Sequence, residues 1–281
     1  MTWDDLDARL DRVPGTVSAY VGRLDAPATW TRTPDATHYA ASTMKVAVLL
    51  ALHRAAEAGT LDLDVPVPVV DEFDSAQPGA PRFSCARHYD NDDAVWERLG
   101  GQATPRWLAD RMITRSSNLA TNLIIDRVGL PAVAQAWQLA GARHSVTGRG
   151  IEDAAAREAG ITNLVTPADL AALLGGLATG AEHPGPLASP AACAAMLDVL
   201  LAQRHREDLA AGLPDGTRIA HKNGWVRGVR HGAGVVLPDD APAYVIAVCT
   251  TTDLAASPDD ACRLVAEISA TAWAARHDLA G

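Results

Sequence analysis

The chain has 281 residues, of which 48% are hydrophobic and 21% charged, a composition typical of a soluble globular protein and not of a disordered chain. Its formal net charge of −10 argues against a nucleic acid or an anionic membrane as a partner of the whole surface. The four cysteines show no C-x-x-C spacing and form no compact cluster with histidines, so we expect neither a metal site nor a cofactor.

The first 13 residues are acidic and amphipathic, and they lack the basic start and apolar centre of a signal peptide. No apolar run reaches the ~20 residues that span a bilayer. We therefore expect a monomeric cytoplasmic protein that contacts neither membrane nor nucleic acid. A secreted protein without its leader would have a similar sequence.

Strand-like segments occur near both ends of the chain, and helical patterns fill the middle. Segment 60–104 is rich in Pro, Asp and Gly and predicts loops and short helices. Strands are expected at 16–24, 28–33, 217–225, 230–238 and 243–251. Helices are expected at 3–13, from about 42 onward, and at 105–116, 118–129, 131–141, 166–180, 190–203 and 258–278.

This order predicts an α+β fold in which strands from the two ends form one antiparallel sheet around an all-helical insertion. We expect a single domain over 1–281. Its α/β lobe would comprise 1–41 and 205–281, and its helical lobe about 42–204.

Three short clusters carry residues that can perform chemistry. Ser42 and Lys45 lie one turn apart at the start of an apolar helix, where the lysine could deprotonate the serine. Segment 116–118 reads Ser-Ser-Asn at a helix break, and 222–224 reads Lys-Asn-Gly inside a strand. Taken singly, each has a plain structural interpretation: a helix cap, a second cap and an exposed edge-strand charge.

Together, the order and spacing of these clusters resemble the class A β-lactamase and penicillin-binding protein superfamily, whose motifs are S-x-x-K, S-D-N and K-T-G. The stretches "MITRSSNLATNLIIDRVG" and "LLAQRHREDLAAGLPDGTRIAHKNG" resemble the surroundings of the second and third motifs. The resemblance covers nearly the whole chain. It implies a β-lactamase/transpeptidase-like fold and an acyl-enzyme mechanism.

The resemblance also implies roles for individual residues. Ser42 would be the acylated nucleophile and Lys45 its base, and Ser116, assisted by Lys222, would pass a proton to the leaving nitrogen. Asn118 would bind an amide of the substrate, and Lys222 and Asn223 would bind its carboxylate. Gly224 and Trp225, next to them, would also be substrate-binding residues. The backbone N–H groups of Ser42 and Trp225 would form the oxyanion hole. The substrate would thus be a small molecule with a carboxylate or an amide.

The sequence departs from the family pattern at three points. Ser117 replaces an Asp, and Asn223 replaces the Thr or Ser of K-T-G. The Glu-x-x-x-Asn motif that activates the deacylating water is absent. Glu152 is the candidate substitute, in a loop that we expect Asp153 and Arg149 to hold by pairing. This loop resembles that of β-lactamase-like serine hydrolases from high-GC bacteria.

Three functions follow from these observations. The main hypothesis is a serine hydrolase that acts through an acyl-enzyme on a lactam, amide or ester. The alternatives are an intracellular acyltransferase or esterase of specialised metabolism, and a binding or sensor protein that is acylated without turnover. His231 either projects into the site or caps a strand end, and Trp225 either lines the cleft or simply packs.

Overall fold

A five-stranded antiparallel sheet organises the computed structural model, which describes residues 1–24, 26–253 and 257–280. Strands from the two ends of the chain meet at its centre, because β1 pairs with β12 over their full length. The strand order is β10-β11-β12-β1-β2. The strands are β1 (Thr16–Arg23), β2 (Ala28–Arg32), β10 (Arg218–Val226), β11 (Val229–Leu237) and β12 (Tyr244–Thr251).

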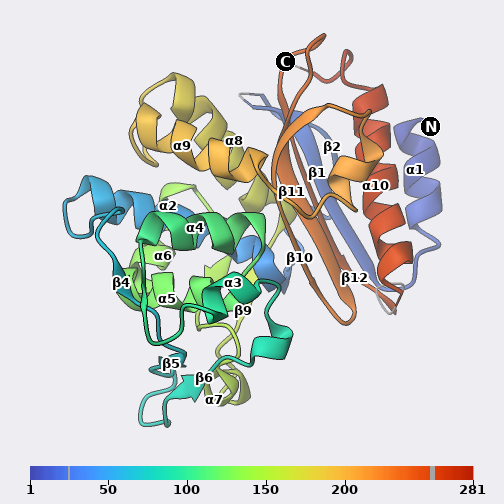
Figure 1. Ribbon diagram of the computed structural model, residues 1–281. Helices are drawn as coiled ribbons and strands as arrows, with labels where there is room; N and C mark the ends of the chain where they lie inside the picture. Colours follow the sequence, from blue (N-terminus) through green and yellow to red (C-terminus); the bar gives the residue numbers. More distant parts are fainter. Residues whose placement is uncertain (25, 254–256, 281) are drawn as a thin grey trace.

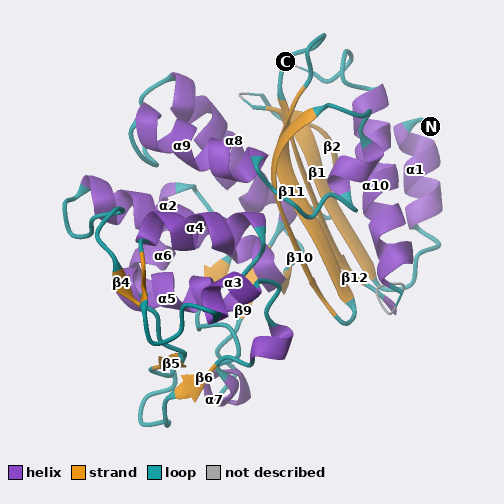
Figure 2. Ribbon diagram, viewed as in Figure 1, coloured by secondary structure: helices purple, strands orange, loops and turns teal. Residues whose placement is uncertain are grey.

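Both faces of this sheet are covered by helices, which explains why β11 and β12 are buried along nearly their whole length. Helices α1 (Trp3–Leu10) and α10 (Pro258–Ala274) cover one face (Figure 1). The other face packs against the helical part of the molecule. Figure 2 shows the resulting layers, with the helices of the middle of the chain gathered on one side of the strands.

The helical part contains six longer helices, and α2 runs through its interior with every residue from 45 to 53 buried. They are α2 (Lys45–Glu57), α4 (Pro105–Thr114), α5 (Asn118–Val128), α6 (Leu130–Leu139), α8 (Pro167–Glu182) and α9 (Pro190–Leu201). Shorter helices are α3 (Asp93–Trp96) and α7 (Ala154–Glu158), with 3-10 turns η1 (Ala41–Met44), η2 (Arg87–Tyr89) and η3 (Leu209–Gly212).

The predicted α+β architecture is confirmed, and element ends differ from expectation by a few residues. The first helix ends at Leu10 instead of residue 13. Helix α8 begins as its sequence favours, because the Thr166 side chain accepts from the backbone N–H of Asp169 and Pro167 takes the first helical position.

Seven short strands escaped sequence analysis, since two or three residues are too few to show an alternating pattern. They are β3 (His38–Tyr39), β4 (Val67–Pro68), β5 (Glu72–Phe73), β6 (Phe83–Ser84), β7 (Gln102–Ala103), β8 (Val146–Thr147) and β9 (Asn163–Val165). Pairing of β3 with β9 matters most, because it lies immediately before Ser42 in the chain.

Cys249 lies in β12, Cys193 in α9 and Cys262 in α10, and all three are buried with free thiols. None of the described helices is long and apolar enough to cross a membrane.

Candidate active site

Ser42 does not cap the helix that follows it. It lies in the 3-10 turn η1, and α2 begins only at Lys45, with no side-chain cap on either element. The Ser42 hydroxyl has no hydrogen-bond partner among the described residues, and its side chain lines an open cleft. A half-buried, unengaged hydroxyl in a cleft is what a nucleophile requires.

Lys45 is fully buried and is not a surface charge. Its Nζ atom donates to the carbonyl oxygens of Ser116 (2.8 Å) and Ser117 (3.3 Å) and to Asn118 Oδ1 (3.1 Å). It also lies 3.3 Å from Ser116 Oγ. The structure thus brings the first and second motifs together through this one ammonium group.

Ser116 is the point where all three motifs meet. Its hydroxyl lies 3.3 Å from Lys45 Nζ and 3.1 Å from Lys222 Nζ, and its side chain is fully buried. The residue adopts φ +58°, in the left-handed region that non-glycine residues seldom occupy. This strained conformation, at the break between α4 and α5, places the side chain between two lysines. Backbone strain of this kind is typical of functional sites.

Sequence analysis did not identify Asp90. This residue supplies a carboxylate beside Ser117, and Ser117 is the residue that replaces the Asp of the family's motif. Asp90 Oδ2 accepts from the Ser117 hydroxyl (3.1 Å) and from the backbone N–H of Leu119 (2.8 Å). Ser117 in turn caps α5 by accepting from Ala120. Asn118, at the start of α5, donates to the carbonyl of Tyr89 (3.0 Å). The missing carboxylate is thus replaced from a neighbouring loop.

Lys222 lies on the edge strand β10 and yet is fully buried. Its Nζ atom donates to the carbonyl of Asn223 (2.8 Å) as well as contacting Ser116. Asn223 Nδ2 donates to Asp208 Oδ2 (3.2 Å), a carboxylate that also binds the guanidinium of Arg230 at 2.9 Å. Asp208 and Arg230 are both buried, and neither was singled out from the sequence.

Gly224 allows β10 to approach the serine closely. A Cβ atom at this position would lie 2.7 Å from the backbone nitrogen of Ser42 and 3.0 Å from that of Thr43. The next residue, Trp225, lines the cleft and also stacks edge-on against His205, so both interpretations of this tryptophan apply.

Burial controls the charge of both lysines. It lowers the pKa of Lys45 to about 7, even though the carboxylate of Asp90 acts in the opposite direction. It also lowers the pKa of Lys222 well below the ordinary value for lysine, and the positive charge of Lys45 lowers it further. An amine with a pKa near 7 can accept a proton at neutral pH, which a free lysine cannot.

Glu152 also faces the cleft that contains Ser42. Its backbone adopts φ +68°, and Oε2 accepts from the backbone N–H of Ala86 (3.0 Å). The other oxygen, Oε1, is buried without a hydrogen-bond partner among the described residues. Burial raises the pKa of this carboxyl group.

The expected pairing of Asp153 with Arg149 is wrong. Asp153 accepts from the Ser75 hydroxyl and the Ala76 N–H, each at 2.8 Å, and it caps α7. Arg149 instead donates to the carbonyls of Ile161 and Gly150 and to the Tyr39 hydroxyl. These two side chains hold the loop through backbone groups and through the hydroxyls of Ser75 and Tyr39, contacts that sequence spacing does not reveal.

The cleft has a volume of about 670 Å³. Of the predicted site residues, Ser42, Asn118, Glu152 and Trp225 line it. Lys45, Ser116 and Lys222 are buried and joined by hydrogen bonds. His231 is fully buried and bonds to the Tyr39 carbonyl and the Thr250 N–H, and it is not among the residues that line the cleft.

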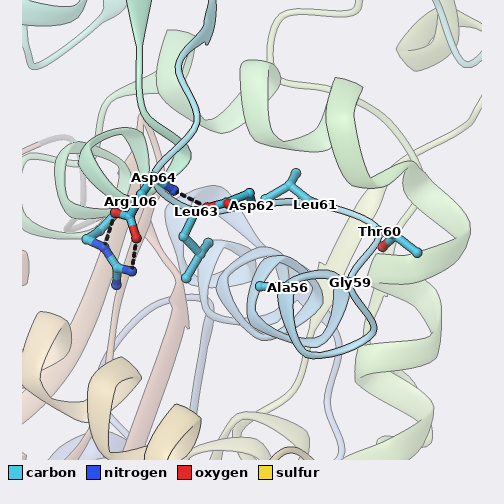
Figure 3. Close-up of a pocket in the computed structure, with 8 residues that line it drawn as sticks. All are labelled: Ala56, Gly59, Thr60, Leu61, Asp62, Leu63, Asp64 and Arg106. Atoms are coloured by element: carbon cyan, nitrogen blue, oxygen red, sulfur yellow. Dashed lines mark hydrogen bonds and ion pairs between the residues drawn. The ribbon is translucent and has the colours of Figure 1, made fainter.

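A second hollow, of about 460 Å³, opens at the other end of α2 (Figure 3). Arg106 binds both carboxylate oxygens of Asp64 there, each at 2.7 Å. This second hollow contains none of the predicted site residues. The end of α2, the loop after that helix and Arg106 line it.

A serine in a cleft, backed by two buried lysines that share a second serine, defines an acyl-transfer enzyme of the active-site-serine class. The sequence profile of the beta-lactamase enzyme family matches residues 2–275, so this chain belongs to that family and is a serine hydrolase of the class A β-lactamase-like superfamily.

Solved structures agree with this assignment. The chain is similar to PBP-A, with 26% identity, coverage of 98% of this chain and 96% of that one, and a TM-score of 0.79. It is also similar to a β-lactamase from Sphaerobacter thermophilus DSM 20745, with 25% identity, full coverage of both chains and a TM-score of 0.80. A further similar structure, at 26% identity and a TM-score of 0.77 over 99% and 98% of the two chains, is a Leu-to-Glu mutant of PBP-A as an acyl-enzyme with penicillin G. A comparison with curated protein sequences finds no match.

Proposed function

We propose that Ser42 attacks the carbonyl carbon of a lactam, amide or ester and forms an acyl-enzyme. Lys45, as a neutral amine, accepts the proton of the Ser42 hydroxyl. When the scissile bond breaks, Ser116 gives its proton to the departing atom and regains one from the lysines that it contacts. The observation that carries this proposal is the position of Ser116 Oγ, within 3.3 Å of Lys45 Nζ and 3.1 Å of Lys222 Nζ.

Substrate binding follows from the remaining residues of the three motifs. Lys222 and Asn223 hold a substrate carboxylate, and Asn118 binds an amide of the acyl group. The backbone N–H groups of Ser42 and Trp225 stabilise the oxyanion as it forms. The close approach of Gly224 in β10 to the Ser42 backbone in η1 supports an oxyanion hole formed by these two segments.

We further propose that water is the acyl acceptor and that Glu152 is the base that activates it. Among the residues that the structure describes, only one of its carboxylate oxygens accepts a hydrogen bond, and the residue shares the cleft with Ser42. Its raised pKa makes it a stronger base than an exposed glutamate. Hydrolysis is favoured over acyl transfer to an amine because this carboxylate can activate a water molecule for attack on the acyl-enzyme.

Intact-protein mass spectrometry after mixing with penicillin G tests both steps, since a related protein forms an acyl-enzyme with this compound. Wild-type protein should gain the mass of one penicillin, and Ser42→Ala should not. Glu152→Gln should acylate normally and keep the adduct about 10²–10⁴ times longer, the usual contribution of a general base.

Adduct formation in Ser42→Ala at the wild-type rate would refute the nucleophile. Equal adduct lifetimes in wild-type and Glu152→Gln protein would refute the base. If product formed only after an amine was added, the protein would be an acyltransferase. If the adduct never decayed under any condition, it would be a sensor.

A further inference from the structure

The cleft is lined by three arginines, although the chain as a whole carries a net charge of −10. They are Arg149, Arg157 and Arg227, and they come from different segments. A concentration of one charge in a cleft, against the sign of the whole molecule, raises the local concentration of ligands of the opposite charge.

Arg149 is a buried cation without a carboxylate partner among the described residues. Only 3% of its surface is exposed, and its guanidinium donates to two backbone carbonyls and a tyrosine hydroxyl. An unpaired buried charge is costly, and an anion in the adjacent cleft would offset part of that cost.

Arg157 and Arg227 are both exposed, and neither forms an ion pair with a residue that the structure describes. Arg157 lies in α7, directly after the Glu152 loop. Arg227 lies in the two-residue turn that joins β10 to β11, since Val226 pairs with Val229. One arginine thus comes from each side of the cleft.

The acidic residues of the cleft do not neutralise these arginines. Asp153 uses its oxygens for Ser75, Ala76 and the cap of α7. Glu152 uses Oε2 for the backbone N–H of Ala86, and its Oε1 atom is buried. Neither carboxylate lies within ion-pair distance of a cleft arginine.

Arg227 and Lys222 lie on opposite sides of Gly224 along the chain, and Gly224 faces the Ser42 backbone. Lys222 precedes Gly224 by two residues and is fully buried behind the cleft. Arg227 follows Gly224 by three residues, in the turn after β10, and lines the cleft. An anion at the arginines is therefore distinct from the carboxylate assigned to Lys222 and Asn223.

We propose that the acyl part of the substrate carries a second anionic group, which Arg157 and Arg227 bind at the outer end of the cleft. The substrate is then a dianion, with one charge on each side of the bond that Ser42 cleaves. This inference rests on the proposed function, because it takes Ser42 as the point of attack.

Two penicillins that differ in one charge provide the test: 6-aminopenicillanic acid acylated with adipate, and the same nucleus acylated with heptanoate. Their side chains have nearly equal length, but only the adipyl chain ends in a carboxylate. Binding is measured by calorimetry to the Ser42→Ala protein, so that no chemistry is needed. The adipyl compound should bind about tenfold more tightly, as expected for charge-assisted hydrogen bonds at a partly exposed site.

This preference should disappear when Arg157→Ala and Arg227→Ala are combined in the Ser42→Ala protein, and it should weaken at high salt. Arg218→Ala is the control, because Arg218 is an exposed arginine at the start of β10 that forms no ion pair with a residue that the structure describes. It removes one positive charge outside the cleft and should leave the preference unchanged.

Equal affinity for the two penicillins, no binding of the adipyl compound at millimolar concentration, or a preference that survives the double substitution would each overturn the proposal. The mass-spectrometric experiment on the wild-type protein reports separately on Ser42. A charge preference without acylation would retain the anion site and refute the proposed chemistry, whereas acylation without a preference would do the reverse.

Discussion

The rate of Ser42 acylation should rise with pH because Lys45 must be neutral to act as a base. Burial lowers the pKa of this amine from 10.5 to about 7. At pH 7.5 an exposed lysine is neutral in about one molecule in 10³, whereas a lysine with a pKa of 7 is neutral in about three-quarters of the molecules. The buried position therefore increases the supply of base several-hundredfold.

Between pH 6 and pH 8 the neutral fraction of Lys45 should rise about tenfold and then level off, and the acylation rate should follow it. Rapid-quench mass spectrometry with excess penicillin G measures this rate directly. Lys45→Arg, whose guanidinium stays protonated, should lose at least about 10²-fold at every pH.

The same measurement on Lys222→Arg identifies the group that titrates. Arginine keeps a permanent charge at position 222, so a pH profile that persists in this variant belongs to Lys45. A flat rate from pH 6 to pH 8, or near-normal acylation by Lys45→Arg, would refute the assignment of Lys45 as the base.

Two substitutions test the framework around the site. Gly224→Ala should reduce acylation about 10²-fold or more, because its Cβ would meet the backbone nitrogen of Ser42 at 2.7 Å. Gly185→Ala, whose Cβ would lie 4.0 Å from its nearest neighbour, should leave the acylation rate unchanged. Asp208→Ala should lower the free energy of unfolding by about 3–5 kcal/mol in urea titrations, since it leaves the buried Arg230 without its main partner. Glu207→Gln, which alters the more exposed partner of Arg230, should cost less than about 1 kcal/mol, and equal losses in the two variants would contradict this account.

The sequence by itself determined the fold class and the three motifs of the site. Strand patterns at both ends and helical patterns between them predict a sheet closed by the two termini, because alternation and helical periodicity are local properties of a chain. The spacing of Ser42 and Lys45 is local in the same sense. The order of the three clusters can also be read directly from the sequence, and it was enough to indicate the superfamily.

Local pattern also misled in identifiable places. The pairing of Asp153 with Arg149 was inferred from their nearness in sequence, but Asp153 binds residues 77 and 78 positions away. The sequence shows that Ser117 replaces the family's Asp, but it does not show that Asp90 supplies a carboxylate from a loop 27 positions earlier.

Only the tertiary structure decided the chemical state of the site. The sequence proposes Lys45 as a base, but the lowered pKa values of Lys45 and Lys222 come from burial that the whole fold creates. Their meeting at Ser116 joins residues 71 and 106 positions apart. Burial and long-range contact depend on how all the elements pack, and a pattern within one segment carries no record of them.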